Sequence, residues 1–253
     1  MLKHRVIPTL LLKDGGLVKT RKFDNPQYVG DPVNAIRIFN EKEVDELTLL
    51  DIGASKQGRE PDYALIEEVA GECFMPLTYG GGIKTIEQAV RIFRSGVEKI
   101  CLQSLCFENL SIVRELVDSF GSQSIVVSVD VRRSFFVEDR LYSSSINSVM
   151  RSKPIQSYLA ELMEVGVGEI ILGSVDKDGT LSGPDTELIT LASRNLDVPL
   201  VALGGISSLL DMRSAVKAGA HAVSAGAYFI FHGKRRAVLI TYPDYDELER
   251  LFD

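Results

Sequence analysis

Short apolar runs alternate with amphipathic stretches along almost the whole chain. The apolar runs are nearly continuous, which is typical of strands covered on both faces in a parallel sheet, and the stretches between them carry apolar residues at helical spacing. Pro8 inside the first run is unusual for a central strand. The predicted strands cover residues 5–12, 46–52, 74–77, 97–103, 124–130, 169–173, 200–203 and 220–225.

Helices are predicted between these strands. Asp31 and Pro32 form a helix start, with an N-cap followed by proline in the first turn, and Glu60 with Pro61 opens the next helix. The remaining helices are predicted at residues 84–95, 108–120 and 153–165, from 184 onward, up to 218, and from 244 onward. Eight strand–helix units of this length predict an α/β protein with the (β/α)8 (TIM) barrel fold.

Two glycine-rich turns indicate that the barrel consists of two similar halves. Residues 78–83 (Thr-Tyr-Gly-Gly-Gly-Ile) follow one strand, and residues 204–206 (Gly-Gly-Ile) follow another, with Gly82 and Gly205 separated by 123 positions. In both copies the following helix ends at a glycine 14 residues after the last glycine of the turn, at Gly96 and Gly219. We therefore predict a two-fold half-barrel repeat with a phosphate-type turn in each half.

Two segments interrupt the regular pattern. After a turn at residues 13–16, the polar stretch up to residue 30 is predicted to be a long loop. After the fifth strand, apolar residues 135–137 and 141–142 flank a charged turn at 138–140, which predicts an inserted hairpin.

The composition fits one soluble globular domain covering residues 1–253. The chain is 45% hydrophobic and 25% charged, and barrels of this length form single domains. No apolar run approaches the roughly 18 residues that a membrane helix needs, and the first residues lack a secretory pattern. Three cysteines without metal-type spacing fit a reducing compartment, so we expect a cytoplasmic protein. The net charge of −7 argues against nucleic acid as a partner.

Polar residues at the carboxyl ends of the strands are candidates for chemistry, because barrels of this fold carry their active sites there. Asp130 ends the fifth strand, and Asp51, Gln103 and Ser174 lie near the ends of theirs. A carboxylate in this place can act as an acid, a base or a polar anchor. The alternative is that Asp130 only caps a loop, and we favour the functional role.

The glycine turns favour two phosphate sites. Residues 224–227 (Ser-Ala-Gly-Ala), at the end of the last strand, would contribute to the phosphate site at the second glycine turn. Two such sites suit a long substrate with a phosphate at each end. Lys19 in the first loop could reach a phosphate or remain solvated.

Charged residues begin four of the strands, at the opposite end of the barrel. Arg5, Glu46, Lys99 and Glu169 could form a closed ring of salt bridges, although the sequence pattern alone favours ordinary ion pairs. The three histidines, at positions 4, 221 and 232, have no spacing typical of a metal site. We therefore predict no metal and no cofactor, and the basic run at residues 234–236 is too short to indicate a nucleic-acid partner.

These motifs together resemble the cyclase subunit of imidazole glycerol phosphate synthase over essentially the full chain. The matching segments are residues 13–15 (Lys-Asp-Gly), 18–19 (Val-Lys), 30–32 (Gly-Asp-Pro), 45–47 (Asp-Glu-Leu), 50–52 (Leu-Asp-Ile), 80–83 (Gly-Gly-Gly-Ile), 120–123 (Phe-Gly-Ser-Gln), 168–170 (Gly-Glu-Ile) and 178–180 (Asp-Gly-Thr).

The resemblance implies a barrel that receives ammonia from a separate glutaminase subunit. That subunit would be a heterodimer partner on the N-terminal face of the barrel, and ammonia would pass through the barrel to a bisphosphorylated substrate. Arg5, Glu46, Lys99 and Glu169 match the residues of a salt-bridged ammonia gate, and Glu98 matches an acidic docking position.

The resemblance also implies the residues of the pocket. Asp130 matches one of two catalytic aspartates. The positions that match phosphate- or substrate-binding residues are Lys19, Asp51, Gly81, Gly82, Gln103, Ser104, Asp178, Gly179, Thr180, Gly204, Gly205, Gly226 and Ala227.

The pocket departs from the family pattern at three places. Leu11 stands where the family has its other catalytic aspartate, Gln103–Ser104 replaces an asparagine–threonine pair, and Gly226–Ala227 removes a hydroxyl. Losing one positioned acid or base typically costs about 10²–10⁴ in rate. The departures therefore affect the residues for ring closure and cleavage of the histidine-pathway substrate, whereas all four residues of the ammonia gate are present.

Residues 10–20 and 231–240 resemble a paralogue of that subunit found with surface-polysaccharide (lipopolysaccharide O-antigen) genes. With a glutaminase and a sugar amidotransferase as partners, such a paralogue would serve to convert an acetamido sugar into an acetamidino sugar. This implies a phosphorylated or nucleotide-linked small-molecule substrate, and we favour this hypothesis. The alternatives are a genuine cyclase of L-histidine biosynthesis, with Asp130 alone sufficing, and a non-catalytic ammonia conduit that activates the glutaminase.

Overall fold

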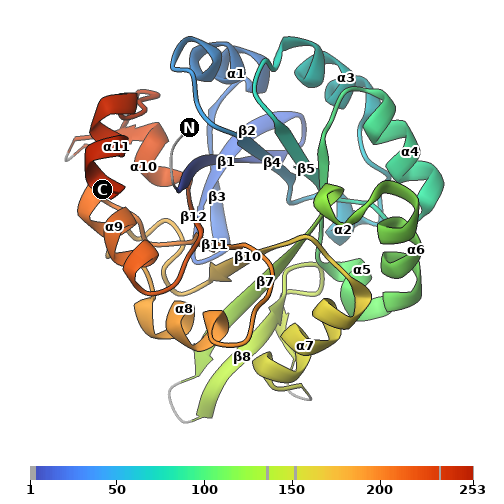
Figure 1. Cartoon of the computed structure of the whole chain (residues 1–253). Helices are drawn as coiled ribbons and strands as arrows, with labels where there is room; N and C mark the ends of the chain where they lie inside the picture. Colours follow the sequence, from blue (N-terminus) through green and yellow to red (C-terminus); the bar gives the residue numbers. More distant parts are fainter. Residues whose placement is uncertain (1–3, 135–136, 151–152, 234, 253) are drawn as a thin grey trace.

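Eight parallel strands form a closed barrel with helices around it (Figure 1). The computed structural model describes residues 4–134, 137–150, 153–233 and 235–252. Strand β1 pairs with both β4 and β12, and β10 pairs with both β7 and β11, so no edge remains in the barrel. The predicted (β/α)8 fold is confirmed. The barrel strands are β1 (Arg5–Lys13), β4 (Leu47–Asp51), β5 (Leu77–Gly80), β6 (Lys99–Leu102), β7 (Ile125–Ser134), β10 (Glu169–Ser174), β11 (Leu200–Leu203) and β12 (Ala222–Ala225).

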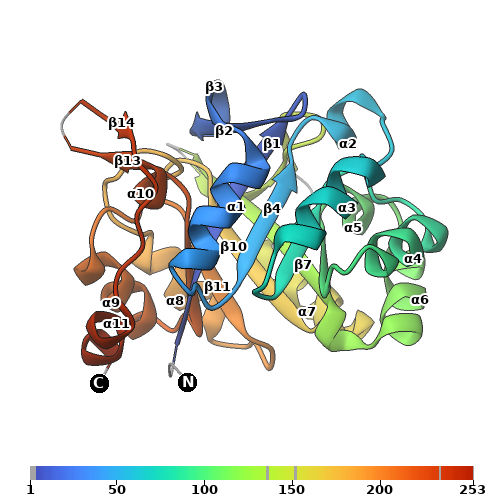
Figure 2. The same ribbon diagram turned by 90° about the horizontal axis from the view of Figure 1, so that it is seen from above.

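The helices of eight or more residues follow one another around the outside of the barrel in chain order (Figure 1). Figure 2 shows the two ends: both chain termini lie at the N-terminal end of the strands, and the inserted hairpins lie at the other. The helices are α1 (Pro32–Glu41), α2 (Ala54–Gln57), α3 (Tyr63–Glu72), α4 (Ile86–Arg94), α5 (Ser104–Glu108), α6 (Leu110–Phe120), α7 (Ile155–Val165), α8 (Thr186–Ser193), α9 (Leu209–Lys217), α10 (Ala227–Ile230) and α11 (Tyr245–Phe252), with a 3-10 turn at Ser122–Ser124.

Side-chain caps set the starts of the helices. Asp31 accepts the N–H of Asn34, which confirms the predicted start of α1, and Thr85 with Gln88 forms a capping box on α4. The predicted start of the second helix at residues 60–61 was wrong. Helix α3 begins at Tyr63, because the Asp62 carboxylate accepts the N–H of Leu65 at 3.2 Å and so caps the helix two residues later.

The third strand lies later in the chain than the apolar run at residues 74–77 predicted. It runs from Leu77 to Gly80, so the first glycine of the turn belongs to the strand. A Cβ at Gly80 would lie 2.8 Å from the Cys101 carbonyl oxygen, so only glycine allows this close strand packing. Phe74 is outside the strand and 86% exposed, and its N–H donates to the Asn40 side chain at 3.1 Å.

The stretch at residues 13–30 is a hairpin and not the predicted loop. Strands β2 (Gly16–Arg21) and β3 (Asp24–Gly30) extend from β1 as a β-meander. The turn uses Lys22 and Phe23, with φ of 57° and 62°, where a hairpin normally has glycine or asparagine. The sequence therefore lacks the usual turn signal, and tertiary contacts hold the turn.

The hairpin predicted after the fifth strand is present with different bounds. Strand β7 continues to Ser134 and pairs with β8 (Val137–Ser143), which then pairs with β9 (Ser148–Val149). The charged residues 138–140 lie in β8 and not in a turn, and residues 135–136 are outside the described part of the chain. A further short hairpin joins β13 (Phe231–His232) to β14 (Ala237–Val238).

Buried side chains form two separate apolar layers because strand residues alternate between the inside and the outside of a barrel. The larger layer fills the space between strands and helices. The smaller one fills the inside of the barrel and consists of Ile7, Cys101, Val126, Ile171, Val201 and Ala222, with Leu50 and Leu203 packed against it.

Substitution of Gly168 should destabilise the fold. A Cβ at this position would lie 2.1 Å from the carbonyl oxygen of Ser122, which belongs to the backbone and cannot move aside cheaply. We expect Gly168→Ala to lower the free energy of unfolding by about 1–3 kcal/mol in urea titrations. Gly71→Ala in α3 is the matched control, because open space surrounds it, and it should raise stability by about 0.5–1 kcal/mol. Similar effects of both substitutions would contradict this packing argument.

Candidate functional site

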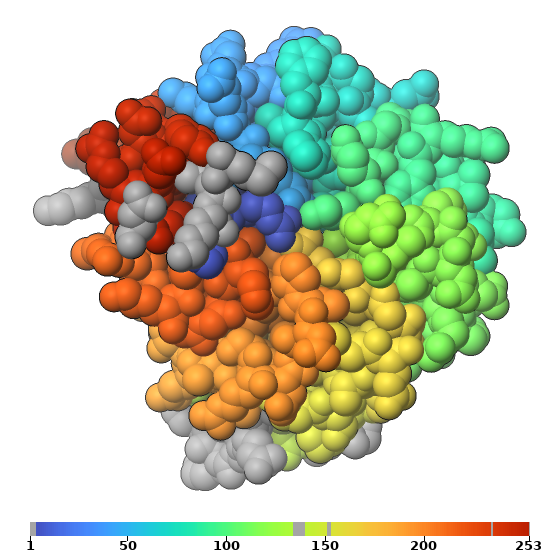
Figure 3. Space-filling model, in the orientation of Figure 1, coloured from blue at the N-terminus to red at the C-terminus, as the bar shows by residue number. Residues whose placement is uncertain are grey.

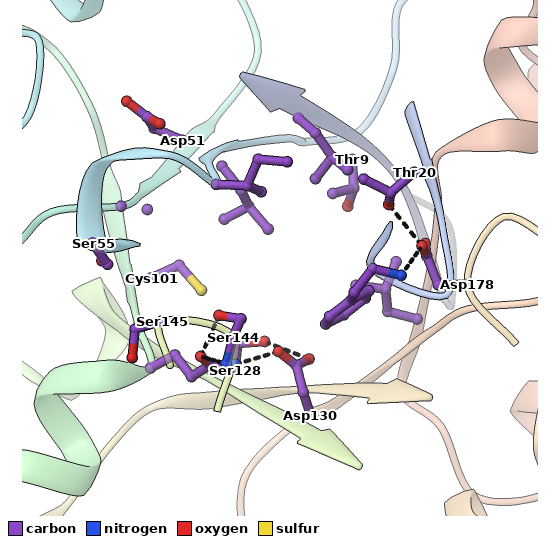
Figure 4. A pocket seen from close by; sticks show the side chains of 18 of the residues that line it. Thr9, Thr20, Asp51, Ser55, Cys101, Ser128, Asp130, Ser144, Ser145 and Asp178 are labelled. Atoms are coloured by element: carbon purple, nitrogen blue, oxygen red, sulfur yellow. Dashed lines mark hydrogen bonds between the residues drawn. The ribbon is translucent and has the colours of Figure 1, made fainter. Parts of the chain in front are cut away.

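A pocket lies at the carboxyl ends of the barrel strands (Figure 4). The structure brings most of the predicted site residues into its wall, together with Leu11. Thr180, Gly204 and Gly205 are not part of the wall. The predicted residues that line it are Lys19, Asp51, Gly81, Gly82, Gln103, Ser104, Asp130, Asp178, Gly179, Gly226 and Ala227.

The Asp130 carboxyl group is buried at the end of the barrel interior, where β7 leaves the barrel. Ser128 donates to one carboxyl oxygen at 3.1 Å and the Gln103 amide donates to the other. Burial raises the pKa of Asp130 to about 7, with Asp178 adding to the rise, while the two hydrogen bonds oppose it. A Cβ at Gly173 would lie 2.2 Å from Asp130 Oδ1, so the neighbouring strand needs glycine there. Asp130 can therefore exchange a proton near neutral pH.

Gln103 joins Asp130 to the β8–β9 hairpin. Its amide nitrogen donates to Asp130, and its amide oxygen accepts the N–H of Ser144 at 3.0 Å as well as the Ser144 hydroxyl. Both ends of the amide are thus used, so the hairpin and the carboxyl group hold each other in place (Figure 4).

The Lys19 amine is buried, which excludes the solvated alternative. It donates to the Thr9 carbonyl oxygen at 2.5 Å, and the side chain is 5% exposed. Burial lowers the pKa of Lys19 to about 8, although the charge of Asp178 raises it. A Cβ at Gly226 would lie 2.5 Å from the amine, so the glycine there leaves room for it.

Asp178 holds the β2–β3 hairpin over the pocket. Its carboxylate accepts the Thr20 hydroxyl at 2.7 Å and the N–H of Phe23 at 3.2 Å, and its carbonyl oxygen accepts the N–H of Lys22 at 2.9 Å. These three bonds account for the left-handed turn at Lys22 and Phe23. Thr20 and Asp178 face each other at the edge of the pocket in Figure 4.

The first glycine turn is braced by α2. The Asp51 carboxylate accepts the N–H groups of Gly53 and Ala54 at 2.8 and 3.0 Å and points away from the pocket centre (Figure 4). Ser55 accepts the N–H of Gly82 at 3.2 Å and the Ser104 hydroxyl at 3.4 Å. The Asp51 carboxylate therefore shapes the loop, while Ser55 and Ser104 bring two hydroxyl groups to the glycine turn.

The second glycine turn packs against the loop that follows β10. The N–H of Gly183 donates to the Gly205 carbonyl oxygen at 2.9 Å, and a Cβ at Gly205 would lie 2.1 Å from the Gly183 carbonyl oxygen. Gly204 and Gly205 thus let two loops approach, and on this side the pocket wall comes from Gly179, Gly226 and Ala227.

A ring of four charges lies at the N-terminal end of the barrel, and we call Arg5, Glu46, Lys99 and Glu169 the charge ring. Arg5 pairs with both glutamates, and Lys99 Nζ lies 2.9 Å from Glu46 and 3.0 Å from Glu169. The sequence had favoured ordinary ion pairs at this place, but the four side chains form a closed ring of alternating sign. Figure 3 shows the face on which β1 (blue) reaches the surface near the centre.

The ring keeps Glu169 and Arg5 charged. Burial alone would raise the pKa of Glu169, but the hydrogen bonds and charges of Arg5 and Lys99 outweigh it and hold this pKa below its usual value. Burial alone would lower the pKa of Arg5, and the two glutamates raise it instead. Beside the ring, the exposed Glu98 accepts the N–H of Leu77 at 2.7 Å and so caps the start of β5.

Several hydroxyl groups that line the pocket were missed in the sequence. Ser55 and Ser144 come from inserted elements without a motif, so nothing in the sequence marked them. Thr9 and Ser128 occupy inward positions two residues before Leu11 and Asp130, and the period of two along each strand was a signal that could have found them.

Within the described ranges, no group of three or more His, Cys, Asp and Glu side chains is arranged to hold a metal ion. None of the helices described is both long and apolar enough to cross a membrane.

The chain is thus a (β/α)8 barrel with a pocket that contains Asp130 and Lys19 at the mouth where barrels of this fold carry out their chemistry. It belongs to the histidine biosynthesis protein family, whose model matches residues 5–235. It is 52% identical to the "Putative imidazole glycerol phosphate synthase subunit hisF2" of Pseudomonas aeruginosa, over 98% of this chain and 99% of that protein. It is 48% identical to a protein of Leptospira interrogans described as "Putative imidazole glycerol phosphate synthase subunit HisF", over the whole of both chains. The "Imidazole glycerol phosphate synthase subunit HisF" of Exiguobacterium sibiricum is 37% identical, over 90% of this chain and 91% of its own.

Asp130→Asn should stabilise the protein in a pH-dependent way. The folded-state pKa is raised from 3.8 to about 7, so the folded protein binds this proton more tightly than the unfolded chain does. Stability is therefore lost as the pH rises from about 4 to about 7, and the full penalty is present above pH 7. The variant should gain up to about 4 kcal/mol at pH 8, falling toward zero near pH 4, in urea titrations. Asp118→Asn on the exposed side of α6 is the control, and an equal pH dependence there would refute the assignment.

Proposed function

We propose that this chain is the ammonia-accepting synthase subunit of a glutamine amidotransferase complex. The observation that carries the proposal is the closed charge ring at one end of the barrel with the pocket around Asp130 and Lys19 at the other. Relatives at 37–52% identity are described as synthase subunits, which supports assembly with a further chain. The partner is a glutaminase subunit that docks on the N-terminal face, with Glu98 at the contact.

In this proposal, Arg5, Glu46, Lys99 and Glu169 form the gate through which ammonia enters the barrel. The next layer inward is apolar, so it favours neutral ammonia over the ammonium ion, whose burial is costly. Ammonia then reaches the pocket beside Asp130. A group with a pKa near 7 suits proton transfer during attack by an amine at neutral pH.

The substrate is a phosphorylated or nucleotide-linked small molecule. One phosphate binds at Gly81, Gly82 and Ser104, where the Ser55 and Ser104 hydroxyls meet the glycine turn. The other binds at Gly226 and Ala227, with Gly179 and the amine of Lys19 close by. Asp51 and Thr180 hold the surrounding loops, and Gly204 with Gly205 lets them approach.

The finer proposal is that the complex converts an acetamido sugar into an acetamidino sugar for lipopolysaccharide O-antigen, with a sugar amidotransferase as a further partner. Leu11 supports this departure from the histidine pathway, since it places a hydrocarbon in the pocket wall where a proton-exchanging group is expected. The relatives described as "hisF2" or "hisF3" are 43–52% identical to this chain, whereas those described as "Imidazole glycerol phosphate synthase subunit HisF" are 37–38% identical. This difference in identity supports a separate group within the family.

A second candidate is the genuine cyclase of L-histidine biosynthesis. The family match over residues 5–235 and the placement of Asp130 at the pocket favour it. In that case Asp130 alone would suffice for the acid–base chemistry.

Turnover of the bisphosphorylated histidine-pathway precursor separates these two candidates. With excess ammonium and no glutaminase, we expect no product from the native chain. Leu11→Asp restores a carboxylate and should raise turnover by about 10²-fold or more over background. Leu11→Asn is the matched control, because it is polar but cannot exchange a proton, and it should remain inactive. Native turnover comparable to that of the aspartate variant would favour the cyclase instead.

The partner is tested by mixing the purified chain with a glutaminase subunit from the same organism and measuring glutamine hydrolysis. Binding with stimulated hydrolysis supports the proposal. Failure of that glutaminase, and of the histidine-pathway glutaminase of the same organism, to bind the chain would refute it.

A further inference from the structure

The C-terminal segment of the chain contacts the residues on either side of Arg5, a member of the charge ring. The Tyr242 hydroxyl donates to the Val6 carbonyl oxygen at 2.9 Å. The Phe252 ring packs edge-on against His4, with 5.3 Å between ring centroids. Arg5 therefore lies between two positions that the last twelve residues hold.

The Tyr242 contact lies at a gap in the barrel sheet. The ladder between β1 and β4 begins at Thr9 and Thr48, and on the same register Val6 would face Asp45. Side chains take the place of strand pairing between β1 and β4 there. The Asp45 carboxylate accepts the N–H of Val6 at 3.3 Å, and the Tyr242 hydroxyl donates to the carbonyl oxygen of Val6. On the β4 side the backbone beside Arg5 is thus held by side chains, whereas on the other side Arg5 and Val6 pair with Ala222 and Val223 of β12.

The hydrogen bonds of Val6 lie next to both partners of the salt bridge between Arg5 and Glu46. Val6 directly follows Arg5, and Asp45 directly precedes Glu46. A shift of Val6 would move the guanidinium away from Glu46 and Glu169 together, because Arg5 pairs with both. Lys99 lies across the ring on β6 and shares none of these backbone contacts.

The match to the family model ends at residue 235, before Tyr242 and Phe252. We infer that the C-terminal segment is a positioning element for the charge ring, with Tyr242 as the residue that sets the place of Arg5. The segment thereby determines how tightly the ring closes the N-terminal end of the barrel. The ring is observed directly, and only its use as an ammonia gate rests on the proposed function.

Urea denaturation of the purified full chain tests the positioning role without any partner. Tyr242→Phe removes only the hydroxyl and should lower the unfolding midpoint. In an Arg5→Met background this fall should shrink by at least half, because the ring contact that Tyr242 positions is already absent. In a Lys99→Met background the fall should stay unchanged. Arg5→Lys serves as a milder background should Arg5→Met fail to fold.

Tyr245→Phe is the matched control, since Tyr245 lies three residues further along the same segment and is 46% exposed. It should have no effect in any background. Equal falls for Tyr242→Phe in all backgrounds would overturn the inference and leave Tyr242 a local packing residue.

The complex with the glutaminase gives a second readout. Tyr242→Phe should at least double the share of glutamine-derived ammonia that escapes to solvent, with glutaminase binding unchanged. An unchanged share would overturn the gate role of the segment. If no glutaminase binds at all, the proposed function fails, while the denaturation cycle still decides whether Tyr242 positions Arg5.

Discussion

Closure of eight parallel strands forces every second side chain of each strand into the barrel interior, and this constraint orders the whole molecule. Successive inward positions form layers across the barrel. The charge ring is the lowest layer, an apolar layer follows, and hydroxyl groups such as Thr9 and Ser128 lead up to Asp130. Each layer consists of side chains at one height along the strands, so its chemistry is set by the residues at that height alone.

Burial sets opposite conditions at the two ends of this interior. In the charge ring, two acids and two bases compensate one another, and Arg5 and Lys99 hold the pKa of Glu169 below its usual value despite its burial. In the pocket, burial shifts the pKa of Asp130 and of Lys19 toward the neutral form, and the charge of Asp178 offsets this only in part for Lys19. The pocket therefore carries a cost in stability that the ring avoids, as expected where groups are held ready to exchange protons.

The sequence predicted what depends on local pattern and missed what depends on distant contacts. Strand–helix alternation gave the barrel, and the cap at Asp31 gave the start of α1. The β2–β3 hairpin was missed because its turn at Lys22 and Phe23 is held by Asp178, more than 150 positions away. The burial of Lys19 was unforeseen for a similar reason, since it needs the space left by Gly226, which follows the last barrel strand. The resemblance supplied Asp130 and the ring residues as a set, and the structure shows how they are arranged.

The apolar layer between the ring and the pocket has a consequence for how such a protein diversifies. The ring and its surroundings are made from the strand starts, whereas the pocket wall owes much to inserted hairpins and to side chains such as Leu11 and Ser144. Changes at one end need not disturb the other, because an apolar cluster inside the barrel lies between them. Under the proposed function, a duplicated copy can thus keep its ammonia supply while its acceptor changes, so that partner choice and substrate choice can change independently in one barrel.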